Sequence, residues 1–280
     1  MFRTRTAVAL AALAILPLAG CDHDRDGGPS HTEPAFQWRG TVPAGGWVRI
    51  RDLNGSVRVG QARGAETVIT ATRRYRGRDP QRVRFVAQPD ANGVTACALW
   101  GEGGECTAER YENRRSGGSR SWFARLLALG GRRGGGVTVD YVVAVPAGVR
   151  IDARTVNGRV IVADATSEVV AHSVNGTVTV GGAGGPVRLQ TVNGRVNARL
   201  DRLAAGASVE LKTVNGSVSA FLPSTVDADV ALATTNGRVQ SDFPLASPEG
   251  GRRSLRGTLG AGGRRIALES VNGSVKLGRL

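Results

Sequence analysis

Side chains that could perform acid–base chemistry are few in this sequence and do not gather. Enzymes that cleave glycans need two convergent carboxyl groups, or a general base beside a cationic clamp. The candidate carboxylates fall on different expected turns and strands, and no repeated position is consistently acidic; they are Asp152, Asp164, Asp227, Asp229 and Asp242. We therefore predict no catalytic residues. A carbohydrate-active enzyme remains the alternative, and three or more acidic side chains converging in one groove would support it.

The histidines give no stronger sign of a ligand site. His172 occupies a repeated position that elsewhere holds Arg51, Arg154, Gln190 or Lys212, so we expect it to be an outward polar side chain. The segment around His23 has the composition of a disordered tether rather than of a strong metal site. The sequence thus predicts no metal and no cofactor.

The N-terminal segment resembles the signal peptide of a bacterial lipoprotein. Arg3 and Arg5 precede an apolar run, which ends in the lipobox-like motif Leu18-Ala19-Gly20-Cys21 and is too short to span a bilayer as a helix. We predict cleavage before Cys21, a lipid anchor on Cys21 and a location in the cell envelope facing the periplasm. An ordinary secretory signal is the alternative. Asp22 resembles an inner-membrane retention signal, but the choice between inner and outer membrane stays open.

Export to an oxidising compartment predicts a disulfide between Cys97 and Cys106. The short loop between them suits a link across a strand, a turn and a second strand. Two buried thiols are the alternative. A metal site is not expected, because no histidine lies near either cysteine.

The formal net charge of +14 comes almost wholly from arginine, since Lys212 and Lys276 are the only lysines. In a bacterial envelope, such a charge favours anionic lipids, lipopolysaccharide, acidic glycans or an envelope protein as partners, rather than nucleic acid. The alternative is that the arginines only keep the surface soluble.

Seven Asn-Gly pairs mark an internal repeat. Valine always stands three residues after the asparagine, and apolar residues stand six and four residues before it, which predicts strands with one buried face. The pairs begin at Asn54, Asn157, Asn175, Asn193, Asn215, Asn236 and Asn272. From Asn157 onward their separations are 18, 18, 22, 21 and 36 residues. A period near 20 is typical of stacked units, and the last separation predicts one coil without its Asn-Gly pair.

Two architectures fit these strands. Asn-Gly between alternating segments is a strong hairpin signal, which favours an antiparallel β-meander. However, the residue before the asparagine is apolar in six of the seven copies, although a hairpin would place it on the polar face. In a β-solenoid with about 18–22 residues per coil, Thr and Val before the asparagine can both point inward, and the asparagines can stack and hydrogen-bond. We predict an all-β solenoid and keep the meander as the alternative.

The sequence also predicts the domain organisation. Val-Pro-Ala-Gly occurs at 42–45 and again at 145–148, the same offset as from Asn54 to Asn157, so we expect one continuous solenoid over residues 36–280. It follows a signal peptide (1–20) and a flexible tether (21–35). A basic Gly-rich insertion at about 112–136 breaks the repeat. There, a short helix with Trp122, Phe123, Leu126 and Leu129 on one side would contact a membrane or partner, or cap the stack.

The Asn-Gly-x-Val repeats and the ending resemble a known domain. That ending runs through Asp242-Phe243-Pro244-Leu245, Ser254-Leu255-Arg256-Gly257 and Gly260-Ala261-Gly262-Gly263 to the last repeat. From about Phe36 to Leu280, the chain is similar to the bacterial domain called toastrack or "putative adhesin", akin to GIN-domain adhesin-like proteins. The resemblance implies a single-stranded right-handed β-helix on a cell-envelope protein, in some lineages associated with envelope-stress components. It supplies no catalytic residues, so we expect a non-catalytic binding or scaffold lipoprotein.

Overall fold

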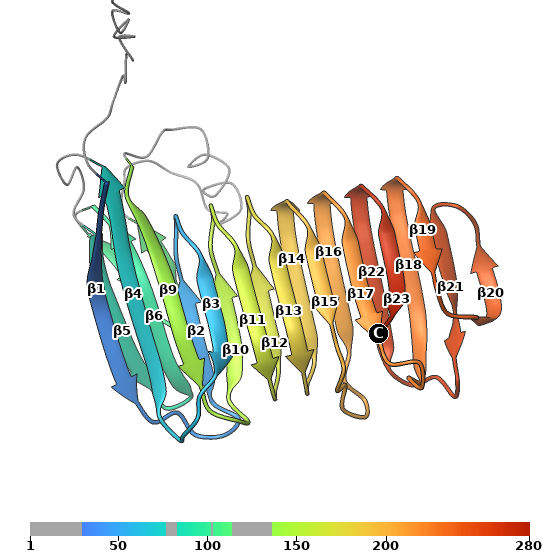
Figure 1. The fold of residues 1–280 in the computed structure, drawn as a ribbon, viewed down its shortest axis with the longest axis horizontal. Helices are drawn as coiled ribbons and strands as arrows, with labels where there is room; N and C mark the ends of the chain where they lie inside the picture. The colour runs from blue at the N-terminus through green and yellow to red at the C-terminus, as the bar shows by residue number, and fades with distance from the viewer. Residues whose placement is uncertain (1–29, 77–82, 102, 114–135) are drawn as a thin grey trace, which may run out of the picture.

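The computed structural model describes residues 30–76, 83–101, 103–113 and 136–280, which form strands and turns but no helix (Figure 1). Two long sheets, A and B, lie face to face, and a third sheet has two strands. The all-β prediction is therefore confirmed. No helix in the described part of the chain is long and apolar enough to cross a membrane.

The spatial order of the strands in each sheet differs from their order in the chain. From one edge to the other, sheet A contains β1 (Ser30–Gly40), β4 (Thr67–Arg76), β9 (Thr138–Val145), β3 (Val57–Gln61), β11 (Val160–Ala165), β13 (Val178–Ala183), β15 (Val196–Arg199), β17 (Val218–Leu222), β23 (Val275–Arg279) and β19 (Val239–Ser241). Sheet B contains β20 (Ala246–Gly250), β21 (Ser254–Leu259), β18 (Ala228–Asn236), β22 (Arg265–Asn272), β16 (Val209–Asn215), β14 (Val187–Asn193), β12 (Val169–His172), β10 (Arg150–Arg154), β2 (Trp47–Arg51), β6 (Gly93–Trp100) and β5 (Val83–Asp90). The small sheet is the hairpin of β7 (Gly104–Cys106) and β8 (Tyr111–Asn113).

Consecutive repeats stack as parallel strands. A repeat coil consists of one strand of sheet B, an Asn-Gly corner and one strand of sheet A. Val178 of β13 pairs with Val196 of β15, and Val187 of β14 pairs with Val209 of β16, both in parallel register. The two strands that flank an Asn-Gly pair therefore belong to different sheets. The antiparallel meander of hairpins is wrong for these repeats.

Alternation along the strands places the core between the two sheets. The valine three residues after each asparagine is buried in all seven copies, which are Val57, Val160, Val178, Val196, Val218, Val239 and Val275. In sheet A these valines stack in register from coil to coil. Burying one such side chain contributes roughly 1.5 kcal/mol or more, so the repeated valine is a main source of stability in each coil.

The last coil does not lie where its place in the sequence suggests. β22 and β23 pair with β16 and β17 on one side and with β18 and β19 on the other (Figure 1). After β17 the chain builds the β18–β19 coil one position further out, then returns to fill the gap. The expectation of a coil lacking its Asn-Gly between Asn236 and Asn272 is therefore wrong. The intervening residues form the antiparallel strands β20 and β21.

The N-terminal end repeats this arrangement. β2 and β3 pair with β10 and β11 on one side and with β6 and β9 on the other. The two Val-Pro-Ala-Gly turns consequently lie in adjacent coils, and the amide of Gly45 donates to the carbonyl of Gly148 at 2.8 Å. Beyond them, β5, β4 and β1 close the stack with antiparallel pairs. Antiparallel strands extend both sheets at the N-terminal end and sheet B at the C-terminal end, where they cover edges that would otherwise be prone to association. The C-terminal edge of sheet A is β19, which pairs parallel with β23.

The expected boundaries compare with the structure only in part. β1 begins at Ser30, so the ordered sheet starts before the boundary at Phe36, and residues 30–35 are strand rather than tether. The signal peptide and Cys21 lie outside the described residues. So does the expected helix with Trp122, Phe123, Leu126 and Leu129, and with it most of the insertion at 112–136.

Candidate functional site

Asparagine side chains form a hydrogen-bonded ladder along the corner between the sheets. Each Nδ2 donates to the Oδ1 of the next asparagine at 2.8–2.9 Å, in the order Asn236, Asn272, Asn215, Asn193, Asn175 and Asn157. Asn54, which follows in space, donates instead to the carbonyl of Val137 at 2.6 Å. The ladder fixes the register of neighbouring coils and so of the side chains on their outer faces.

Glycine follows each asparagine because neighbouring coils approach too closely for a side chain. A Cβ on Gly176 would lie 1.9 Å from the carbonyl oxygen of Gly158. The hydroxyl two residues before the asparagine donates to this row of glycine carbonyls, as from Thr191 to Gly176 at 2.9 Å. All six such hydroxyl residues are buried and bonded in this way; they are Thr155, Ser173, Thr191, Thr213, Thr234 and Ser270. Buried polar groups are thereby satisfied at each of these corners.

The outer face of sheet B carries a groove along the stack. Depressions of about 640 Å³ and about 420 Å³ share Arg154, His172 and Gln190, so they join into one feature, the sheet B groove. Its central row continues through Lys212 and Glu269, with one residue from each coil in parallel register. His172 lies in this row between Arg154 and Gln190, the position expected for it.

One edge of the groove is apolar because it is lined by the valines that precede the asparagines. Val156 and Val174 are 2% and 4% exposed, whereas Val214 and Val271 are 40% and 41% exposed. The expectation that Thr and Val both point inward therefore holds at the first corners but is wrong at the later ones. An apolar edge beside ordered polar groups is typical of a binding site.

Charged groups in the groove are paired with one another. Asp152 lies between Arg51 and Arg154, at 2.6 Å and 2.8 Å. Burial alone would raise the pKa of Asp152, but the two guanidinium groups hold that pKa below its ordinary value. Glu210 pairs with Lys212 and Arg188, and a hydrogen bond from Lys212 is the main cause of its lowered pKa. These carboxylates are ionised at neutral pH and unsuited to act as general acids.

His172 is neutral at physiological pH. Burial, and then the positive charge of Arg154, lower the pKa of His172 to about 4. A neutral imidazole presents one hydrogen-bond donor and one acceptor. Together with Gln190, it gives the groove an uncharged polar centre between the ion pairs.

Trp47 lies at the N-terminal end of the groove. The guanidinium carbon of Arg150 is 4.5 Å from the centroid of its ring, and that of Arg49 is 5.9 Å from it. Cations at these distances are attracted to an aromatic face. The arrangement holds a large aromatic surface at one end of the groove.

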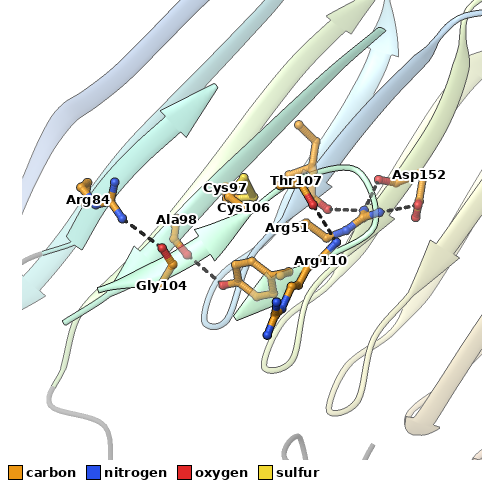
Figure 2. The surroundings of a disulfide bond; sticks show 11 residues. Arg51, Arg84, Cys97, Ala98, Gly104, Cys106, Thr107, Arg110 and Asp152 are labelled. Carbon is orange, nitrogen blue, oxygen red and sulfur yellow. Dashed lines mark hydrogen bonds and ion pairs between the residues drawn. A yellow bond between two sulfur atoms is a disulfide. The ribbon is translucent and has the colours of Figure 1, made fainter. Parts of the chain in front are cut away.

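The hairpin of β7 and β8 covers the outer face of sheet B beyond the groove (Figure 2). The structure contains the predicted disulfide between Cys97 of β6 and Cys106 of β7. The hydroxyl of Tyr111 also donates to the carbonyl of Ala98 at 2.8 Å. Because Cys97 pairs in register with Arg51, the disulfide holds the hairpin next to the Arg51–Asp152 ion pair.

Most of the carboxylates considered in the sequence lie elsewhere. Asp227 and Asp229 accept hydrogen bonds from backbone amides of the turn at 261–263, and Asp242 pairs with Lys276. Asp164, a non-glycine residue with φ of 54°, is an exposed residue of β11. Only Asp152 lines the groove, and the described residues contain no cluster of three metal-ligating side chains.

Sequence reasoning missed Trp47, Glu168, Arg188 and Glu210, which also line the groove. Arg188 and Glu210 each stand two residues before a member of the central row, Gln190 and Lys212. Outward alternation along the strand could therefore have identified them. Three carboxylates, Asp152, Glu168 and Glu210, thus share one depression, but each has a cationic partner.

Asp52 is the exception to the buried hydroxyl row. It stands two residues before Asn54 and is 2% exposed. Neither carboxyl oxygen accepts a hydrogen bond of ordinary geometry from a described residue, although the backbone amides of Leu53 and Asn54 and the hydroxyl of Thr155 lie near enough to oppose the rise of its pKa. Burial raises the pKa of Asp52 well above its ordinary value. The hydroxyl of Tyr141, also buried, has no partner among the described residues either. Asp52 follows β2 and Tyr141 lies in β9, so both are at the N-terminal end of the core.

Comparison with known proteins gives two solved structures that align with this chain. One is described as a "putative cell adhesion protein" from Clostridium sporogenes ATCC 15579, with a TM-score of 0.46 and 8% identity over 89% of this chain and 100% of its own. Another is described as a "putative adhesin" from Bacteroides fragilis NCTC 9343, with a TM-score of 0.28 and 11% identity over 91% of this chain and 99% of its own. No family model matches the sequence, and no curated protein matches it.

Proposed function

We propose that this protein is a non-catalytic binding or scaffold module of the bacterial cell envelope, adhesin-like or associated with envelope stress. The observation that supports this best is the sheet B groove, in which successive coils present polar side chains in fixed register. A groove built on strands holds its side chains in place before a ligand arrives, so little ordering entropy is lost on binding. An extended ligand could contact one polar residue from each coil and the apolar edge at the same time.

The groove is also the place to test the alternative of a carbohydrate-active enzyme. Three carboxylates line one depression, which is the feature that this alternative needs. Glycan hydrolysis further needs a carboxyl group that keeps its proton near neutral pH. The pKa values of Asp152 and Glu210 are instead lowered by their cationic partners, which favours binding over catalysis.

The binding proposal is tested by capture from envelope extract with matched variants. We expect His172→Ala combined with Gln190→Ala to lose at least one component that the unmodified protein retains. The control is Thr179→Ala with Asn197→Ala, two polar residues in register on sheet A, which should retain that component. Equal capture by both variants would contradict a role for the groove. Release of reducing or unsaturated ends from envelope polysaccharide would favour the enzyme.

Membrane attachment through Cys21 is a separate part of the proposal. At high ionic strength, which screens attraction between basic residues and anionic lipids, Cys21→Ser should move the protein from the membrane fraction to the soluble periplasmic fraction, because the lipid chain is then lost as an anchor. Full membrane retention after this substitution would contradict lipid anchoring. The segment Trp122 to Leu129 would then be the next one to delete.

We also propose that the repeat coils wind as a right-handed β-helix. From β12 the chain passes through β13 in the opposite sheet and returns to β14, which pairs parallel with β12. Connections of this kind between parallel strands of one sheet are almost always right-handed.

A further inference from the structure

The outer face of sheet A carries arginines that have no acidic partner. Arg58, Arg159, Arg195, Arg199 and Arg238 are all exposed, and none forms an ion pair with another described residue. In the strands of sheet A from β9 to β19, or within two residues of their ends, the acidic side chains are Asp140, Asp164, Asp201 and Asp242. Asp140 pairs with Arg74, Asp201 with Arg202 and Asp242 with Lys276, and none of the four acids forms an ion pair with one of the five arginines.

Stacking of the coils does not require these arginines. The row two residues after each asparagine holds Arg159, Arg195 and Arg238, but it holds serine or threonine in the other coils. Sheet B has comparable numbers of cations, yet those in its groove are paired with carboxylates. The five arginines of sheet A therefore differ from the cations of the groove. Arg256 and Arg265, which lie on sheet B beyond the groove, also form no ion pair with a described residue.

The spacing of the arginines suits a broad anionic surface rather than a single small anion. Parallel strands lie about 4.8 Å apart, so Arg159 and Arg195, two coils apart in space, are separated by roughly 10 Å along the stack. Arg238 lies three coils beyond Arg195, roughly 14 Å further. Charges spread in this way over a sheet can each meet a different headgroup.

Apolar side chains lie among these arginines. Arg58 of β3 lies between two apolar residues in register with it. They are Val142 of β9, which is 53% exposed, and Ile161 of β11, which is half-buried. Phe221, also half-buried, pairs in register with Arg199. Cations interleaved with apolar groups are typical of surfaces that rest on the headgroup region of a membrane.

The position of the N-terminus is compatible with a membrane that lies against the outer face of sheet A. β1 is the edge strand of sheet A and begins at Ser30, nine residues after Cys21. Nine residues span at most about 30 Å when fully extended. A lipid on Cys21 could therefore enter a bilayer while sheet A lies flat on it, and this one step rests on the proposed lipidation.

We propose that the outer face of sheet A lies on the anionic surface of a bacterial membrane through these five arginines. The sheet B groove then faces away from the membrane, open to ligands. The interaction is electrostatic, so it weakens as ionic strength rises.

The test uses the mature chain, residues 21–280, carrying Cys21→Ser so that no lipid contributes. Its sedimentation with phosphatidylcholine vesicles, with and without phosphatidylglycerol, gives an apparent partition coefficient. Arg159→Gln with Arg195→Gln should reduce binding to phosphatidylglycerol vesicles by about 10- to 30-fold, since one basic residue near such a surface contributes roughly fivefold. Arg256→Gln with Arg265→Gln removes the same charge from sheet B and should change binding by less than about twofold.

Three results would overturn the proposal. An equal loss in both double variants would mean that net charge, and not the sheet A face, attracts the vesicles. Absence of binding to phosphatidylglycerol vesicles would exclude the membrane directly. Binding of a soluble polyuronate through Arg159 and Arg195, without vesicle binding, would assign the face to a glycan. The groove variant His172→Ala with Gln190→Ala should bind vesicles normally, so failure here is separable from failure of the groove proposal.

Discussion

In the middle of the stack, from β10 to β17, each coil packs against the coil that precedes it in the sequence. At the C-terminal end the chain skips one position and fills it later, and at the N-terminal end the first coil, β2–β3, comes to lie between two coils that follow it in the sequence. The middle uses a single pattern of parallel pairs, while the ends add antiparallel strands. A periodic sequence therefore determines the shape of a coil but does not determine its neighbour.

The same comparison applies to polar groups in the interior. In the middle, every buried hydroxyl before an asparagine donates to a glycine carbonyl, as Thr213 does to Gly194 at 3.1 Å. At the N-terminal end, this position holds Asp52, whose carboxyl oxygens accept no hydrogen bond of ordinary geometry from a described residue. The end coil carries an energetic cost that the repeated coils avoid.

The largest expected effect on stability comes from a substitution in the middle of the stack. Val196 is fully buried, and Val196→Asp would place an unpaired charge in the core, so we expect a loss of more than about 4 kcal/mol in the free energy of unfolding, or failure to fold. Val239→Asp, in the strand at the edge of sheet A, should cost less because that valine is 9% exposed. Urea unfolding of both variants measures the difference.

Arg195→Asp is the control beside Val196. It lies on the outer face, where substitutions usually change stability by less than about 0.5 kcal/mol. An equal cost for Arg195→Asp and Val196→Asp would contradict the assignment of inner and outer faces.

The disulfide should stabilise the N-terminal end and not the middle. It closes a loop with a sequence separation of 9 residues, and replacing both Cys97 and Cys106 by alanine should cost about 2–3 kcal/mol. Faster amide exchange should appear in the β7–β8 hairpin and β6 but not in β12 to β16. If thiol reagents label both cysteines in the unfolded, unreduced protein, the bond is absent and the prediction is wrong.

Asp52 should make the stability of the end coil depend on pH. Its pKa is raised in the folded state, so above about pH 4 the unfolded chain loses this proton while the folded protein keeps it. The free energy of unfolding should then fall by up to about 1.4 kcal/mol per pH unit until the folded-state pKa is reached. Asp52→Asn removes this loss. The free energy of unfolding of both proteins can be measured between about pH 4 and 8, the range in which the effect falls. The two values should diverge as pH rises. A constant difference between them would contradict the raised pKa of Asp52.

Much of the repeat could be predicted from the sequence because its cause is local. The buried valine, the hydroxyl and the Asn-Gly corner recur within a few residues, and alternation gives each a face. The row of Arg154, His172, Gln190 and Lys212 in the groove could be found in the same way. These positions depend only on the distance from the nearest asparagine.

The rest depends on which coils are neighbours. Lys212 pairs with Glu269 at 3.3 Å because β22 lies beside β16, whereas sequential stacking would have placed Ala233 there. The exposure of Val214 and Val271, compared with the burial of Val156 and Val174, also follows from differences between corners that share the same residues. Neither the Lys212–Glu269 ion pair nor the exposure of these valines is visible in the repeat pattern, since tertiary contacts set both.

The order of the last coils can be tested directly by disulfide cross-linking. Val214, Val271 and Thr235 are exposed and stand immediately before Asn215, Asn272 and Asn236, which lie in register. Neighbouring strands lie about 4.8 Å apart, within reach of a disulfide, whereas strands two positions apart lie beyond the limit of about 7 Å. Oxidation should therefore link Val214→Cys with Val271→Cys, and Val271→Cys with Thr235→Cys, but should not link Val214→Cys with Thr235→Cys. A link between positions 214 and 235, without one between 214 and 271, would mean that the coils stack in sequence order and that the last coil is not inserted.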